Sequence, residues 1–307
     1  MPGSTQSQWI FPVHSLQHTP SRLTSNIPLE KELYDRARGV EFLFRLGVSL
    51  ALPSCAMYTA ATWFHRFYMR YSMEDYHRQD VAASCIFLAT KTEECGRKLR
   101  DVAKIFCSKV SKTDPKDIPD DSREVEEAQT AILLTEEVLL EALCFDFVVE
   151  SPQKDLVELF EGQEDVFEIQ ECAWSLANDS YRTPLCVLYP PNIVAAACYI
   201  LAQHLTEDPQ TASLAERIAS PAPSASLPTP PTQHPLSSQS ARYAVEYFKF
   251  NEVELSSLGE AIAIILEFYA AQDTQGSAEY LASIASIPPP ISLPNREALY
   301  VPFSHAA

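Results

Sequence analysis

The pattern of apolar and polar positions is most distinctive between residues 77 and 94, which read HRQDVAASCIFLATKTEE. From Val81 to Ala89 the side chains are apolar or small in every direction around a helix. Such a helix is buried in a core or in a membrane, and this run is too short to span a bilayer. We therefore expect a helix at the centre of a protein core, with Lys91 at its rim.

The same pattern occurs a second time. Residues 81–89 read VAASCIFLA and residues 194–202 read VAAACYILA, with six of nine positions identical. Their separation is that of a whole helical domain rather than of a short solenoid unit. His204 stands where the second copy would carry the equivalent of Lys91. The fold is expected to be duplicated, but any role of this lysine is not.

Helical spacing of apolar residues recurs along both halves, whereas strand-type alternation is hard to find. We therefore predict an all-α protein made of two tandem five-helix repeats. The helices expected in the first repeat span 28–49, 53–71, 77–94, 99–110 and 123–145, and those in the second span 152–162, 165–181, 191–205, 241–249 and 252–272.

The remaining segments mark the domain boundaries. An irregular, polar tail is expected at 1–27, with Trp9 and its aromatic neighbour docked on the body. The first repeat should occupy 28–150 and the second 151–272. Composition rich in Pro, Ser, Thr and Ala predicts a disordered insertion at 207–240 and a tail of the same kind at 273–307.

Charge and cysteine usage exclude several classes of protein. The formal net charge is −18, which argues against direct binding of nucleic acid or an anionic membrane surface. The eight cysteines form no CxxC pair and several lie in apolar runs, which indicates core positions in a reducing compartment. With only seven glycines there is no Gly-rich phosphate loop, and no signal peptide or membrane span is found. We expect no catalytic residue, cofactor or metal.

One carboxylate is out of place. Glu136 falls on the apolar stripe of the helix expected at 123–145, between Ile132 and Leu139. A carboxylate on such a face must reach water or find a partner. Two interpretations stay open: Glu136 lies at the edge of the stripe and is solvated, or it pairs with a cation at the rim, for which Lys91 is the candidate.

Other reactive side chains favour structural interpretations. His65 has no second His or Cys at ligand spacing, so we expect a structural histidine. Cys85 and Cys198 lie in the middle of core helices and should be inert. The carboxylates Asp75, Asp80, Glu93 and Glu94 are expected to form a solvated rim, since nothing else resembles a hydrolase site.

Several motifs together resemble one family. HRFYM at 65–69, LATKTEE at 88–94 and Glu136 nine residues before Phe145 match the first box of cyclins in order and spacing. WSLANDS at 174–180, followed by YPPNIVAAACYILA, matches the second box of transcriptional cyclins, and HTPS at 18–21 resembles the start of cyclins K and T. The chain is thus similar to cyclin K, cyclin T and the fungal cyclin (beta) subunit of the RNA polymerase II C-terminal-domain kinase.

The resemblance implies a nuclear, non-catalytic subunit that binds and activates a cyclin-dependent kinase phosphorylating that domain, with a third subunit left open. It implies that Lys91 and Glu136 form a polar pair on the kinase-facing surface, with Phe87, Glu94 and Phe145 beside them. Binding would push the αC helix of the kinase inward, so that its Glu can pair with the strand-three Lys.

Three alternatives remain beside this interpretation. One is another cyclin-type regulator, similar to cyclin C, H or L. Another is a cyclin-fold general transcription factor resembling transcription factor IIB, which would need a basic surface and usually an N-terminal zinc ribbon. This chain is acidic and has no cysteine before Cys55. The third is a helical scaffold that has lost kinase binding.

The segment 37–40 lacks the Met-Arg-Ala-Ile-Leu pattern with which cell-cycle cyclins dock substrates, so the resemblance is not to that group of cyclins.

Overall fold

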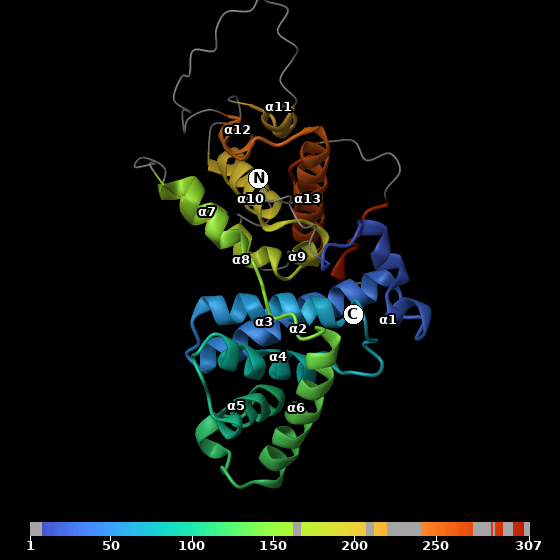
Figure 1. The fold of residues 1–307 in the computed structure, drawn as a ribbon, viewed down its shortest axis with the longest axis vertical. Helices are drawn as coiled ribbons and strands as arrows, with labels where there is room; N and C mark the ends of the chain where they lie inside the picture. Colours follow the sequence, from blue (N-terminus) through green and yellow to red (C-terminus); the bar gives the residue numbers. More distant parts are fainter. Residues whose placement is uncertain are drawn as a thin grey trace, which may run out of the picture. The chain divides into compact units, whose positions relative to one another are not determined.

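The computed structural model describes residues 8–161, 167–206, 212–219, 241–272, 284, 286–290 and 297–303. Across these residues the regular elements are helices and no strand occurs, which confirms the all-α prediction (Figure 1). None of the described helices is both long and apolar enough to cross a membrane. The chain forms two compact units, one of residues 1–149, 181–188 and 306–307, the other of residues 150–180 and 189–305.

The first unit is built around the helix that the sequence places at its centre. Its main helices are α2 (Leu29–Ser49), α3 (Ser54–Phe67), α4 (Arg78–Thr92), α5 (Leu99–Ser111) and α6 (Arg123–Ala142). Helix α4 packs against the other four (Figure 1). Every residue from Val81 to Thr90 is buried. Shorter elements are η1 (Val13–His18), α1 (Pro20–Leu23), η2 (Pro115–Asp117) and α9 (Leu185–Leu188).

Three helices of this unit end earlier than expected. Helix α3 stops at Phe67 rather than at residue 71, α4 stops at Thr92 rather than at 94, and α6 stops at Ala142 rather than at 145. Cys144 and Phe145 both take left-handed backbone conformations, with φ of 52° and 57°. Two such residues in succession cannot continue a right-handed helix. At its other end α6 begins as predicted, because the Ser122 side chain accepts a hydrogen bond from the Val125 N–H.

The second unit repeats the arrangement with the second copy of the apolar motif. It contains α7 (Pro152–Phe160), α8 (Phe167–Ser180), α10 (Pro191–Thr206), α11 (Leu214–Ile218), α12 (Tyr243–Phe248) and α13 (Glu252–Ala271). Helix α10 packs against all the others and is buried from Ile193 to Gln203. Each copy of the motif is therefore the central helix of its unit.

The predicted disordered insertion at 207–240 contains an ordered turn. Helix α11 begins with a capping box, in which the Ser213 side chain accepts from the Glu216 N–H and the Glu216 side chain accepts from the Ser213 N–H. Leu214, Arg217 and Ile218 are buried, so this short amphipathic piece has enough apolar surface to pack. Residues 207–211 and 220–240 of the predicted insertion lie outside the described residues.

The described parts of both tails pack within their units. In the N-terminal segment Trp9 is buried and its indole N–H donates to Asp146 Oδ2 at 2.9 Å, so the expectation that this aromatic docks on the body is confirmed. Leu299 and Tyr300 of the C-terminal segment are buried as well.

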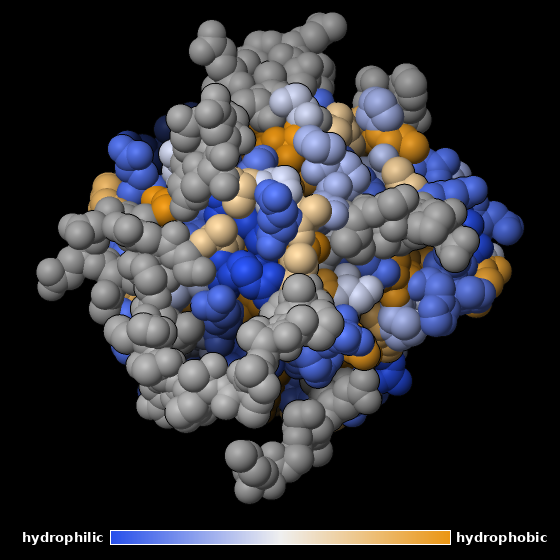
Figure 2. All heavy atoms as spheres, turned by 90° about the horizontal axis from the view of Figure 1, so that it is seen from above, coloured by the Kyte–Doolittle hydropathy of each residue, from blue (hydrophilic) through white to orange (hydrophobic). Residues whose placement is uncertain are grey.

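On the face seen in Figure 2, hydrophilic and hydrophobic residues of the described part are interspersed.

Candidate functional site

The side chains of Lys91 and Glu136 meet at the edge of the interface between α4 and α6. Lys91 Nζ lies 2.6 Å from Glu136 Oε1 and 2.8 Å from Oε2, so one ammonium engages both carboxylate oxygens. The two helices are also tied in the core, where Ser84 Oγ donates to the Ile132 carbonyl at 3.0 Å. Of the two interpretations of Glu136, the pair with Lys91 is confirmed.

The two side chains of the pair differ in their exposure to solvent. The Lys91 side chain is 47% exposed, whereas the Glu136 side chain is 9% exposed. Lys91 Nζ also lies 4.2 Å from the ring centroid of Phe87, one turn earlier on α4, within the range of a cation–π interaction. An ammonium has three N–H donors, and Glu136 takes two of them. The buried Glu136 carboxylate and the buried Phe87 ring therefore hold the ammonium of Lys91 at the surface.

Glu94 and Phe145 lie near the ends of α4 and α6. Glu94 is exposed with φ of 53°, and Phe145 is 65% exposed. Arg70 holds the end of α6 by donating to the Ala142 carbonyl at 3.1 Å, while the Phe145 ring lies 6.3 Å from that of Phe147. In the described part of the chain, no hydrogen bond joins Glu94 or Phe145 to the Lys91–Glu136 pair. The structure thus joins three of the five expected residues directly.

Glu93 differs from the solvated rim position that we expected. Thr59 Oγ1 on α3 donates to Glu93 Oε1 at 2.8 Å, which links α3 to the end of α4. Glu93 therefore fixes the chain just before the exposed Glu94. The sequence carried no signal for this bond, because Thr59 lies on α3 and Glu93 follows the end of α4.

His65 is a structural residue, as expected. It is fully buried, and its Nε2 lies 2.8 Å from the Tyr181 carbonyl, to which it donates. Burial first, and then the nearby Arg36 cation, lower the pKa of His65 to about 3, so the ring is neutral. The histidine of the HRFYM motif thus serves packing rather than chemistry.

A buried polar network beside His65 was missed by the sequence analysis. Arg36 and Glu32 are both fully buried, and the guanidinium donates to Glu32 Oε1 at 2.7 and 3.0 Å. Arg36 also donates to the carbonyls of His65 at 3.1 Å and Tyr68 at 2.8 Å. Thr19 of the HTPS motif donates to Glu32 Oε2 at 2.6 Å. Two of the family motifs therefore meet in one network.

The cysteines that the core surrounds are poor nucleophiles. Burial raises the pKa of the Cys85 and Cys198 thiols, and it raises that of Cys186 to about 12. In the described ranges no cluster of three or more His, Cys, Asp or Glu side chains could hold a metal ion.

The first unit matches the model of the cyclin N-terminal domain over residues 13–148. Cyclin pch1 of Schizosaccharomyces pombe is 44% identical over 209 residues, which cover 67% of this chain and 60% of that protein. Human cyclin-K is 32% identical over 66% of this chain and 34% of its own length, and Arabidopsis thaliana cyclin-T1-4 is 36% identical over 64% and 37%. The chain thus spans less than two thirds of each of these relatives.

Among solved structures, a chain of the yeast RNA Pol II CTD kinase CTDK-1 complex superposes with a TM-score of 0.64. The match covers 94% of this chain and 86% of that chain at 18% sequence identity, so it bears on the fold alone. A chain of the yeast TFIIK (Kin28/Ccl1/Tfb3) complex gives a TM-score of 0.53 at 17% identity. Residues 13–148 thus match the cyclin N-terminal domain, and the chain resembles cyclins K and T in sequence.

Proposed function

We propose that this chain is a regulatory cyclin that binds and activates a cyclin-dependent kinase acting on the C-terminal domain of RNA polymerase II. The observation that carries the proposal is the Lys91–Glu136 pair, which occupies the family's motif positions and lies at the solvent edge of α4 and α6. The sequence similarity to cyclins K and T supports the same function.

The proposed kinase-facing surface consists of Phe87, Lys91, Glu94, Glu136 and Phe145. Lys91 has one N–H donor beyond the two engaged by Glu136, which is available to a carbonyl of the kinase. Phe145 offers an exposed ring as an apolar anchor, and aromatic side chains are common anchors at protein interfaces. Glu94 adds a carboxylate on a fixed turn.

The activation mechanism that we propose is positional. Kinase catalysis requires the Glu of the αC helix to pair with the strand-three Lys. A packed helical body that contacts αC can hold this movable element in its active position. In this mechanism the chain is non-catalytic, needs no cofactor, acts in the nucleus, and leaves room for a third subunit.

The test begins with a pull-down of the chain from native extract, identification of the bound kinase, and reconstitution from recombinant subunits. The complex should phosphorylate peptides of the polymerase tail repeat, with the gain largely in kcat, and the chain alone should not. Lys91→Glu should abolish association, because it places a carboxylate against Glu136 at the contact. Lys91 is half exposed but Glu136 is buried, so leaving this carboxylate without its partner should lower stability by about 1–3 kcal/mol.

The matched control is Lys104→Glu on α5. It makes the same charge change and breaks the ion pair between Lys104 and Asp120. This variant should associate with the kinase normally. Glu136→Lys should weaken activation, and combining it with Lys91→Glu should restore part of it by re-forming the pair in reverse. If Lys91→Glu still co-purifies with an active kinase, the assigned surface is wrong.

A further inference from the structure

A groove unrelated to the Lys91–Glu136 pair lies between α5, residues 113–119 and the first turns of α6. Its apolar lining comes from Phe106, Val110, Ile118, Ala128 and Ala131. Val110 is 47% exposed, whereas Ile118 and Ala128 are buried. The Phe106 ring is fixed from behind by an edge contact with Phe42 at 5.9 Å. The groove therefore presents a preformed apolar floor to solvent.

The rim of the groove is acidic. The ionisable side chains that line it, apart from the Cys107 thiol, are Asp117, Glu124 and Glu127. All three carboxylates are exposed, which leaves them accessible to a cation from a partner.

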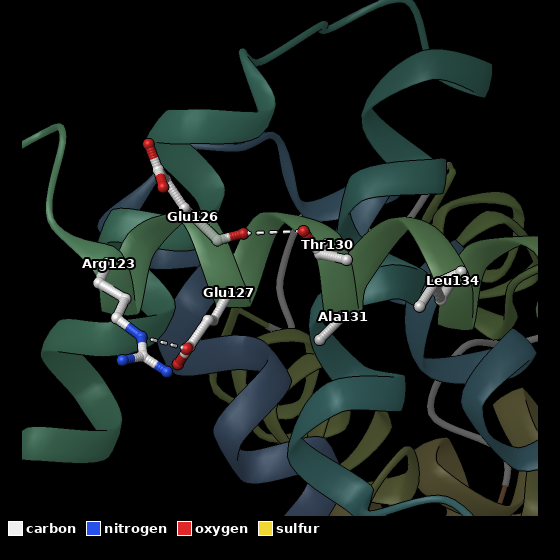
Figure 3. A pocket seen from close by; sticks show the side chains of 6 residues that line it. All are labelled: Arg123, Glu126, Glu127, Thr130, Ala131 and Leu134. Carbon is white, nitrogen blue, oxygen red and sulfur yellow. Dashed lines mark hydrogen bonds and ion pairs between the residues drawn. The ribbon is translucent and has the colours of Figure 1, made fainter.

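A second hollow, lined by side chains of α6, adjoins the groove; Figure 3 shows the residues that line it. It shares Glu127 and Ala131 with the groove and adds Leu134, which is 61% exposed. Arg123 is the cation at this end, and its Nε already donates to Glu127 at 2.7 Å. Because that pair is highly exposed, it contributes little and can be exchanged for a bond to a partner.

We propose that this groove binds an amphipathic segment of a partner protein that carries Lys or Arg beside an apolar residue. The apolar residue would lie over Phe106 and Val110, and the cation would approach Asp117 and Glu124. The negative charge of the rim distinguishes between the possible occupants of the groove. The parts of this chain outside the described residues contain no Lys and one Arg, so they offer little complement to the rim. A second copy carries a net charge of −18 and would be repelled.

The inference does not rest on the proposed kinase function, because the groove and the pair use different residues. Glu124, Glu127, Ala128 and Ala131 line the groove beside α5. Glu136 instead turns toward α4, where it meets Lys91. The two surfaces can therefore be tested one at a time.

The experiment selects random peptides displayed on phage against the full chain and measures the enriched peptides by fluorescence polarisation. The enriched sequences should combine Lys or Arg with a neighbouring apolar residue. Their Kd should rise by about tenfold or more for Val110→Glu and for the Glu124→Lys/Glu127→Lys double variant, a change worth about 1.4 kcal/mol per factor of ten. All substituted positions are exposed, so the variants should fold, and circular dichroism is the check.

Glu141→Lys is the matched control, since it reverses an exposed charge on α6 outside both hollows and should leave the Kd within about twofold. Lys91→Glu should also leave peptide binding intact, whatever it does to kinase association. Three results would overturn the proposal: no enriched peptide family, enrichment of acidic peptides, or equal binding to the wild type and the groove variants.

Discussion

Replacing Arg36 by Met tests whether the buried network organises the first unit. Arg36 and Glu32 are both 0% exposed, and the substitution removes the two bonds donated to Glu32 and those to the carbonyls of His65 and Tyr68. Glu32 would keep Thr19 as a partner but lose its counter-charge. Breaking a buried ion pair from one side costs about 3–5 kcal/mol. In a unit of this size that corresponds to a fall in Tm of roughly 6–20 °C.

The assay is urea and thermal unfolding followed by tryptophan fluorescence in a Trp174→Phe background. Of the three tryptophans, Trp9 and Trp63 belong to the first unit, so the signal then reports on that unit alone. The double variant Glu32→Leu/Arg36→Met removes both charges and should be less destabilised than Arg36→Met, because no unpaired charge remains. A single variant within about 1 kcal/mol of the wild type, or a double variant that is worse than the single, would refute the reasoning.

Two further predictions concern the same unit. A Cβ on Gly39 would overlap the ring of Phe64, so Gly39→Ala should lower the free energy of unfolding by about 1–3 kcal/mol. The control is Gly96→Ala, which should not lower it, because no atom lies within 4 Å of the added Cβ. Equal urea midpoints for the two variants would contradict this prediction. Partial burial raises the pKa of Asp146, but hydrogen bonds from Gln8 and Trp9 outweigh it and the net pKa is lowered. Its stabilising contribution is therefore present above the ordinary carboxyl pKa of 3.8 and is lost as the pH falls through the lower folded value. Asp146→Asn should flatten the dependence of stability on pH in that acidic range, and identical slopes for variant and wild type would count against the bond to Trp9.

Periodicity predicted those features that depend on one element at a time. The all-round apolar run from Val81 to Ala89 indicated a central helix, and it lies at the centre of the first unit. The place of Glu136 on an apolar stripe predicted a need for a partner, and the rim position of Lys91 supplied one. Both inferences use only spacing within a helix and the cost of burying a charge.

The remaining features depend on contacts between distant segments. His65 bonds to the carbonyl of Tyr181, 116 residues away, and no local pattern encodes that choice. Thr59 and Glu93 are 34 residues apart, and their bond fixes the turn beside Glu94.

The Glu32–Arg36 pair did leave a signal, since it sits at i, i+4 spacing next to the apolar stripe of Leu33 and Val40. Charges that close to a core stripe indicate a buried network, just as Glu136 indicates a buried pair.

The placement of Tyr181 in the first unit has a consequence for the order of folding during synthesis. Its ring stacks on that of Tyr58 at 5.0 Å, and its carbonyl accepts from His65, so the unit is discontinuous in sequence. Domains generally fold as units from the N-terminus as the ribosome adds about 5–20 residues per second. When residue 149 has been added, the first unit still lacks residues 181–188. It therefore waits a few seconds with His65 and Tyr58 uncovered, and a nascent chain paused within this interval should be sensitive to proteases at α3.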